Sequence, residues 1–326
     1  MMLEILHDFS MFPLRVSRYD GAAGKQTMYI GDQRYMVKFG YTVDEQQQRS
    51  SRTSYANIPV NEFLGSRIFQ ASGIPTQEVM LGTYGEHSVA ACRDFMQQYP
   101  SSYQLLHFKQ LEISMPGESS LSKARPDWEF VRHVMTDSPY LSTLRSQVFD
   151  RYYKMVCVDA LIGNYDRHSN NWGFIADSDT NIVALAPVYD CGSCLAPHLS
   201  EDAMRDRLAD PRLMRQANMD APYMSMNVRN KRRKFNYFLL SDEGKPFRAQ
   251  LINLHDCLTP QVLDEIVMSV PGISDIRRDF YRTTLHTRRE VVWKPAFELA
   301  LQEREHTLKQ SEPLRSPTRR HKKHIR

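Results

Sequence analysis

The sequence has no long apolar run and no basic leader. No uncharged apolar stretch reaches the ~18 residues that a membrane-spanning helix needs. The first ten residues carry Glu4 and Asp8 inside their only apolar stretch, which is unlike a secretory signal or a transit peptide. We therefore expect a soluble protein that begins in the cytoplasm and has no transmembrane segment. Export by a route without a cleaved signal stays open.

Cysteine is scarce, with five residues at irregular spacing. This pattern argues against a disulfide framework and favours reduced thiols. Cys191 and Cys194 form a CxxC, but a zinc knuckle needs a second pair of cysteines, which the sequence does not offer. A plain turn is therefore favoured over a metal or redox site.

The chain also lacks a charge excess of either sign outside its last residues. The formal net charge is +4, and residues 313–326 contribute six Lys and Arg without an acid, so the remainder carries 4 − 6 = −2. Such a body has no clear electrostatic footprint for nucleic acid. We expect the tail, residues 311–326, to be disordered. It is interpreted as a solubilising terminus, with contact to a polyanion as the alternative.

The first third of the chain reads as strand and turn, in a sequence whose 326 residues leave room for two lobes. Segments 27–30 and 34–40 flank the turn 31–33 and predict a β-hairpin. Pro59 stands where a helix can start, and apolar residues continue at helical spacing to about residue 71. Further β segments are expected around 79–81 and 88–95. We place a β-rich N-lobe at residues 1–97.

Helices and longer loops dominate the pattern from residue 98 to residue 310, which we assign to a C-lobe. Segment 147–162 is apolar on most faces and predicts a buried helix that delivers a polar loop. Segments 172–175 and 181–190 predict a short pair of strands. Helical stretches are expected near 261–270 and 276–305.

Five polar residues in these two lobes carry the chemistry. Asp166 and Asn171 are five residues apart on one loop, and Asp190 follows at the end of a strand. Oxygen ligands of this kind suit Mg²⁺. Phosphoryl transfer needs a carboxylate for the acceptor hydroxyl, oxygens for the metal and a lysine for the phosphates. Lys38 on its strand fits the last role, and Glu62 on the following helix is its expected partner.

Four segments give the chain a family resemblance. They are 36–39 (MVKF), 61–64 (NEFL), 161–171 (LIGNYDRHSNN) and 185–190 (LAPVYD). In these the chain resembles the HipA-like kinases, and among them the short CtkA-type bacterial serine/threonine kinases. The resemblance implies a bilobal α+β protein-kinase-like fold with a β-rich N-lobe and a mainly helical C-lobe. It also implies ATP and Mg²⁺ as cofactors, a protein substrate and autophosphorylation.

The resemblance further implies individual roles. Asp166 would be the catalytic base, and Lys38 would act in catalysis by contacting the nucleotide phosphates. His168 is a further candidate catalytic residue through contact with phosphate, although packing of the loop is the favoured interpretation. Asn171 and Asp190 would hold the metal. The implied nucleotide-contacting residues are Gly24, Lys25, Lys38, Glu62, Arg93 and Phe95. The loop 20–25 lacks the autophosphorylatable serine of many HipA-type loops, so we do not expect self-inhibition through a loop serine.

Several of these positions have plainer interpretations. Glu62 could be a first-turn acid that favours the helix dipole. Asn164 could cap the preceding helix or orient the loop, and Arg167 is expected to anchor it. The basic run 231–234 (KRRK) is most simply a solvated face, with recognition of an acidic or phosphorylated segment as the alternative.

Two other functions compete with the kinase. A pseudokinase or scaffold would bind nucleotide without turnover, but the intact set of Lys38, Asp166, Asn171 and Asp190 argues against it. A metal-dependent phosphoesterase would need several His and Asp residues around two metals. The sequence offers no upstream Asp-x-His for that chemistry.

Overall fold

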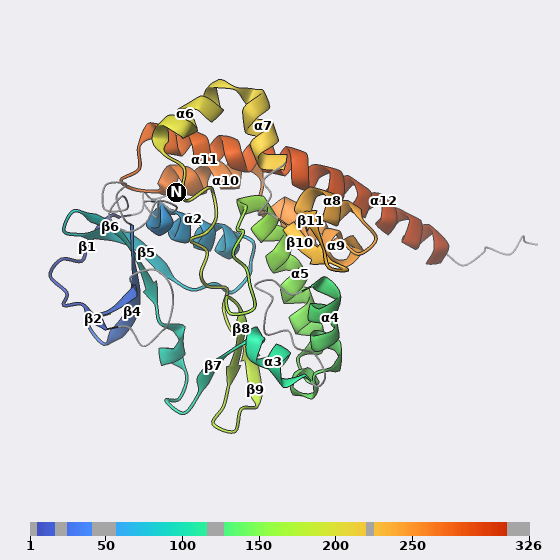
Figure 1. The fold of residues 1–326 in the computed structure, drawn as a ribbon, viewed down its shortest axis with the longest axis horizontal. Helices are drawn as coiled ribbons and strands as arrows, with labels where there is room; N and C mark the ends of the chain where they lie inside the picture. Colours follow the sequence, from blue (N-terminus) through green and yellow to red (C-terminus); the bar gives the residue numbers. More distant parts are fainter. Residues whose placement is uncertain (1–4, 17–24, 41–56, 116–126, 220–224, 312–326) are drawn as a thin grey trace, which may run out of the picture.

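The computed structural model describes residues 5–16, 25–40, 57–115, 127–219 and 225–311. Figure 1 shows a β-sheet and a larger, mainly helical part, with one helix between them. This is the bilobal α+β arrangement that the sequence predicts. No helix of the described residues is long and apolar enough to cross a membrane. The lobe limits at residues 97 and 310 stay predictions.

The N-lobe sheet has six strands in the order β1-β5-β6-β4-β3-β2. The predicted hairpin is confirmed by antiparallel pairing of β3 with β4, and Gly31 in its turn has a φ of 57°, which favours glycine. β6 pairs with both β4 and β5. The strands are β1 His7–Asp8, β2 Arg15–Val16, β3 Lys25–Ile30, β4 Gln33–Phe39, β5 Val79–Tyr84 and β6 His87–Arg93.

One helix, α2 (Ile58–Ala71), covers a face of this sheet. Pro59 lies in its first turn, where a missing backbone N–H costs nothing. Phe63, Leu64 and Ile68 are buried in the core that also receives residues of β5 and β6. Burial of such side chains contributes about 1.5–3 kcal/mol each. The packing therefore fixes α2, and Glu62 with it, against the strands.

The C-lobe begins with a three-stranded sheet of β7 (Gln104–His107), β8 (Gly173–Ala176) and β9 (Ile182–Leu185). The predicted pairing of β8 with β9 is confirmed. β7 was not predicted, because its four residues pair with β8, which lies about 70 residues further along the chain. The central helix α5 (Arg145–Ile162) is buried along its last turns, as expected.

Helices make up most of the remaining C-lobe. The stretch predicted at 276–305 is helical but contains a π-helical turn, Arg289–Trp293, in which the Trp293 indole donates to the Cys157 carbonyl. The hairpin β10–β11 was not predicted. The elements are α3 Phe108–Ser114, α4 Trp128–Asp137, α6 Glu201–Ala209, α7 Pro211–Met219, β10 Ser225–Val228, β11 Lys231–Lys234, α8 Phe235–Leu240, α9 Lys245–Cys257, α10 Pro260–Ser269, α11 Asp275–Arg288 and α12 Lys294–Ser311.

Candidate active site

Lys38 on β4 lies between two carboxylates. Its Nζ is 2.7 Å from Glu62 Oε2 on α2 and 2.7 Å from Asp190 Oδ1, which follows β9. Lys38 and Glu62 are almost fully buried, whereas the Asp190 side chain is 31% exposed. The expected pairing of Glu62 with Lys38 is confirmed. The contact joins a strand, a helix and a loop that lie up to 152 residues apart in the sequence.

The charge on Lys38 is stabilised by this arrangement. Burial by itself disfavours the ammonium, but the carboxylates of Asp190 and Glu62 outweigh it and hold the pKa of Lys38 well above its ordinary value. Lys38 therefore presents a permanent cation at the place where the sequence expects phosphate oxygens.

Glu62 has a second contact that secures the segment after Asp190. Its Oε1 accepts a hydrogen bond from the backbone N–H of Cys191 at 3.1 Å. Beside it on the helix, Asn61 Nδ2 donates to the Cys194 carbonyl at 2.6 Å. Gly65 permits the approach, since a Cβ there would lie 2.7 Å from Cys191 Cβ. α2 is thus bonded to residues 191–194.

The loop that carries Asp166 starts where α5 ends. Gly163 closes the helix in the left-handed conformation, with φ 66°. Asn164 then forms hydrogen bonds with residues before and after it in the chain. Its Nδ2 donates to Asp159 Oδ1, and its Oδ1 accepts the Asp166 N–H. Of the two interpretations of Asn164, the structure therefore shows orientation of the loop. The capping position of the helix is taken by Gly163.

Arg167 anchors this loop, as expected. Its guanidinium forms a buried ion pair with Asp159, with Nε 2.9 Å from Oδ2. One terminal nitrogen also donates to two backbone carbonyls, Asn171 at 2.7 Å and Tyr189 at 2.5 Å. The same side chain therefore brings the backbone of Asn171 next to the residue that precedes Asp190.

Asp166 lies at the surface of this framework, with a side chain that is 47% exposed. Its backbone carbonyl accepts the Asn171 amide at 2.8 Å and the His168 N–H at 2.9 Å. His168 Nε2 is 3.9 Å from Asp166 Oδ1, and its Nδ1 accepts the Asn170 N–H. His168 is thus next to Asp166, and its catalytic role stays a prediction.

Asp190 has an unusual backbone. Its φ of 57° is rare for a residue with a side chain and costs free energy that surrounding contacts must offset. The ion pair with Lys38 and the Cys191–Glu62 hydrogen bond are such contacts. The strained turn directs the carboxylate toward β4.

Tyr189 lies on the other side of this turn. Its hydroxyl is 2.8 Å from His107 Nδ1, and its ring centroid is 5.9 Å from that of Phe95. Burial raises the pKa of Tyr189, so the phenol stays neutral. Phe95, a candidate nucleotide-contacting residue, is therefore connected through Tyr189 to the turn that carries Asp190.

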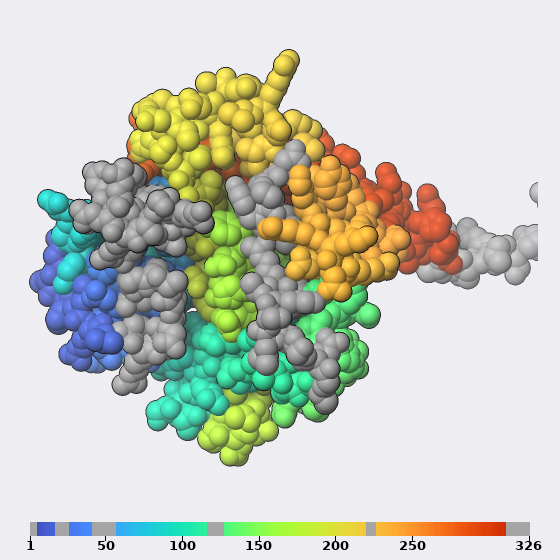
Figure 2. All heavy atoms as spheres, in the orientation of Figure 1, coloured from blue at the N-terminus to red at the C-terminus, as the bar shows by residue number. Residues whose placement is uncertain are grey.

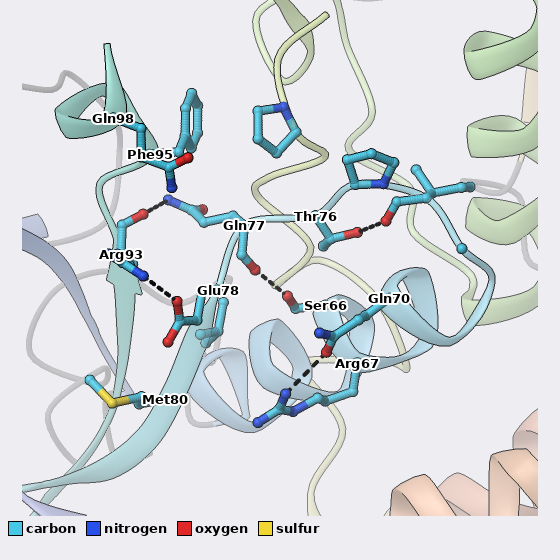
Figure 3. A pocket seen from close by; sticks show the side chains of 15 residues that line it. Ser66, Arg67, Gln70, Thr76, Gln77, Glu78, Met80, Arg93, Phe95 and Gln98 are labelled. Carbon is cyan, nitrogen blue, oxygen red and sulfur yellow. Dashed lines mark hydrogen bonds and ion pairs between the residues drawn. The ribbon is translucent and has the colours of Figure 1, made fainter.

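Arg93 lies apart from the charged cluster. Its guanidinium bonds Gln33 and Glu78 and lines a hollow of ≈ 660 Å³ (Figure 3). This hollow includes neither Lys38 nor Asp190. Among the other candidate nucleotide-contacting residues, Phe95 lines the same hollow, and the contact of Arg93 with a nucleotide stays a prediction. The hollow is lined by Ser66, Arg67, Gln70, Gly73, Ile74, Pro75, Thr76, Gln77, Glu78, Val79, Met80, Arg93, Phe95, Gln98 and Pro187.

Two other residues are expected to contact the nucleotide. Gly24 lies outside the described residues. Lys25 begins β3, and its backbone pairs with that of Lys38. Their proposed contact with phosphates stays a prediction.

The oxygen donors fit the expected metal. Asn171 and Asp190 offer an amide and a carboxylate, and Mg²⁺ is commonly held by one or two protein oxygens plus phosphates and water. In the described part of the chain, no three His, Cys, Asp or Glu side chains gather as a metal site. An ion held by Asn171 and Asp190 would take its remaining ligands from a bound phosphate and from water.

The cysteines do not form a reactive pair. Cys191 and Cys194 are buried and free, and burial raises the pKa of Cys191 to about 12. A thiol of this kind is a poor nucleophile. The interpretation of the CxxC as a turn agrees with the hydrogen bond from the Cys194 N–H to the Cys191 carbonyl.

Sequence reasoning missed Asp159 and Tyr189. Asp159 had a signal, because it is the single charged residue in the apolar last turns of the helix, residues 155–162, and precedes Arg167 by eight residues. Tyr189 had none beyond its position, since its role depends on the pairing of β7 with β8 that brings His107 beside it.

Comparisons with known proteins identify a family and a relative that this chain resembles. The model of the HipA-like C-terminal domain family matches residues 17–270. The serine/threonine-protein kinase CtkA of Helicobacter pylori (strain J99 / ATCC 700824) is 28% identical over 296 residues, which span 88% of this chain and 87% of that protein.

Two solved structures match the chain to different extents. The crystal structure of a Helicobacter pylori proinflammatory kinase CtkA superimposes with a TM-score of 0.80 at 24% identity, covering 92% of this chain and 99% of that one. HipA in the Shewanella oneidensis MR-1 toxin–antitoxin complex with HipB and operator DNA gives a TM-score of 0.47 at 13% identity, covering 88% and 70%.

The fold and the site together define a two-lobed, kinase-like protein. The chain belongs to the HipA-like C-terminal domain family, because the family model covers most of its length. The resemblance inferred from the motifs is therefore confirmed, and the name of the relative from H. pylori agrees with the predicted class of serine/threonine protein kinases.

Proposed function

We propose that this protein is an ATP- and Mg²⁺-dependent serine/threonine protein kinase that transfers the γ-phosphate to a protein hydroxyl and phosphorylates itself. One observation carries the proposal: Lys38 is held between Glu62 and Asp190, so a fixed cation lies beside a candidate metal ligand. Phosphoryl transfer needs a cation for the phosphate oxygens and oxygen ligands for the metal, and this arrangement offers both. The similarity to a curated serine/threonine kinase supports it.

Each residue has a defined task in this proposal. Bound MgATP supplies the phosphoryl group, with Asn171 and Asp190 holding the metal. Lys38 binds phosphate oxygens and stays charged through its carboxylate partners. Asp166 orients the acceptor hydroxyl and accepts its proton, a role that its half-exposed carboxylate allows. Arg167 positions the loop from within the core.

Partners and location follow the same proposal. The acceptor is a serine or threonine of a protein substrate, and the nucleotide is ATP. The cytoplasmic origin expected from the first residues and the contact of the basic tail with a polyanion stay sequence-based predictions.

The test is transfer of labelled γ-phosphate from MgATP to the protein and to a generic protein acceptor, followed by mapping of the modified residue. We expect phosphoserine or phosphothreonine with the wild type and loss of label with Asp166→Asn. Nucleotidyl transfer, or phosphate release without transfer, would overturn the proposal. Binding of MgATP without any transfer would favour the pseudokinase.

A further inference from the structure

The basic run 231–234, for which a solvated face is the simplest interpretation of the sequence, forms a regular element of secondary structure. It is strand β11, paired with β10 through a two-residue turn in which Arg229 and Asn230 have φ of 50° and 59°. Positive φ at both positions is typical of the tight turn that matches the twist of a hairpin. Lys231, Arg232 and Arg233 are exposed.

The hairpin is fixed to the C-lobe rather than free at the surface. Met226 and Val228 of β10 are buried in the main core. At the turn, the Asn230 N–H donates to Asp127 and the Arg229 N–H donates to Glu129, both at the start of α4. A strand held at its turn and along its apolar face presents its charges in a defined geometry, which lowers the entropy lost on binding.

The register separates the four charges. Lys231 pairs with Val228 and Arg233 pairs with Met226, so these two cations share one face at the rim of the core. Residues two apart along a strand are about 6.6 Å apart. An extended peptide has the same repeat on one face, so acidic residues at alternate positions match Lys231 and Arg233.

The position of the hairpin suits a substrate. In Figure 2 a lime-coloured part of the chain lies in a recess at the centre of the view, and the orange segment that contains the hairpin lies on one side of it. A protein segment whose hydroxyl reaches Asp166 could therefore extend toward β11.

We propose that the hairpin β10–β11 docks a short Asp- and Glu-rich segment of the protein substrate. This rests on the proposed kinase function and names its substrate class. The footprint is short because acids border it: Arg229 forms ion pairs with Glu129 and Glu243, and Glu243 also lies near Arg233. These carboxylates repel a long polyanion, and the body outside residues 313–326 carries 4 − 6 = −2, so nucleic acid is disfavoured.

Binding is tested apart from catalysis, with the full chain. The probe is a fluorescein-labelled peptide with Glu at alternate positions, and its affinity is measured by fluorescence anisotropy at low and physiological salt. Lys231→Glu/Arg233→Glu should weaken binding about tenfold, with a smaller difference at high salt. The matched control is Arg212→Glu/Arg215→Glu, at two exposed positions of α7. It changes the net charge by the same amount and should bind the peptide as the wild type does.

A second control, Arg319→Glu/Arg320→Glu, separates the tail from the hairpin. Equal losses in the hairpin and α7 variants, or a loss produced only by the tail variant, would overturn the proposal. A single-stranded oligonucleotide of equal charge serves as the competing ligand. If it bound more tightly than the peptide, and if this binding depended on the hairpin, the proposal would be overturned in favour of nucleic acid.

The kinase assay then distinguishes the two proposals. A generic acidic protein acceptor should show a raised KM with the hairpin variant while autophosphorylation stays unchanged. If the wild type transfers no phosphate at all, the proposed function fails, and the anisotropy still decides whether the hairpin binds the acidic peptide. Unchanged thermal unfolding of the variants excludes misfolding as the cause.

Discussion

Asp159 and Arg167 form an ion pair in which the two side chains are 1% and 6% exposed. Removal of one partner leaves a buried charge without compensation. We expect Asp159→Ala to lower the free energy of unfolding by about 3–5 kcal/mol, measured by urea denaturation. The control is Asp202→Ala, which breaks an exposed pair with Arg205 on α6 and should cost below about 1 kcal/mol. Equal effects would contradict the structural role of the buried pair.

Lys38 gives a prediction for alkaline pH. Its folded-state pKa is raised above the ordinary value of 10.5, so its stabilising contribution is complete below that value and is lost only as pH rises through the higher folded pKa. The difference in unfolding free energy between the wild type and Lys38→Met should therefore stay constant from about pH 7 to about pH 10. A difference that shrinks within this range would show that the ammonium is not held by its carboxylate partners.

Substitutions of Asp166 and of Asp190 should impair different steps of the reaction. Asp166→Asn leaves the candidate metal ligands in place, so MgATP should bind while single-turnover transfer falls ~10²-fold or more. Asp190→Asn removes a metal ligand and a partner of Lys38, so binding by calorimetry should weaken as well. Asp150→Asn, in an exposed pair with Lys154, is the control and should change neither quantity.

Gly163 should be sensitive to any side chain. Its φ is 66°, and a Cβ there would meet the Arg288 guanidinium. Because Arg288 is itself buried and cannot move aside freely, Gly163→Ala should cost more than the ~1–2 kcal/mol of a left-handed residue alone. Gly85→Ala is the matched control, because Gly85 has φ 59° but no atom within 4 Å of the position that a Cβ would take. Similar losses in thermal unfolding would show that Arg288 yields without cost.

The basic tail should be dispensable for catalysis. Deletion of residues 312–326 removes six cations and few apolar groups, so it should leave autophosphorylation and thermal unfolding unchanged. Loss of activity in the truncated protein would instead place the tail in the catalytic body.

The sequence was sufficient for elements whose signals are local. The hairpin β3–β4, the start of α2 at Pro59 and the buried helix α5 followed from turn chemistry, proline geometry and apolar periodicity. Lys38 with Glu62 could be paired because both belong to recognised motifs, and the structure confirms their contact.

Elements that depend on distant partners could not be predicted. β7 and the hairpin β10–β11 are only four residues per strand, and their pairing or anchoring is supplied by other segments. The π-helical turn at 289–293 has no periodicity of its own in so short a stretch. The resemblance implies a nucleotide contact for Arg93, which stays a prediction, but pattern alone does not show that its side chain bonds Gln33 and Glu78.

The bonds from α2 to residues 191–194 bear on how such a protein could be controlled. Asn61, Glu62 and Gly65 each contact that segment, so the helix cannot swing outward without breaking the Lys38 pair and two backbone contacts at once. Displacement of this helix as an on–off device would therefore be energetically expensive. Control by access of nucleotide or acceptor to an already assembled catalytic framework is the less costly alternative.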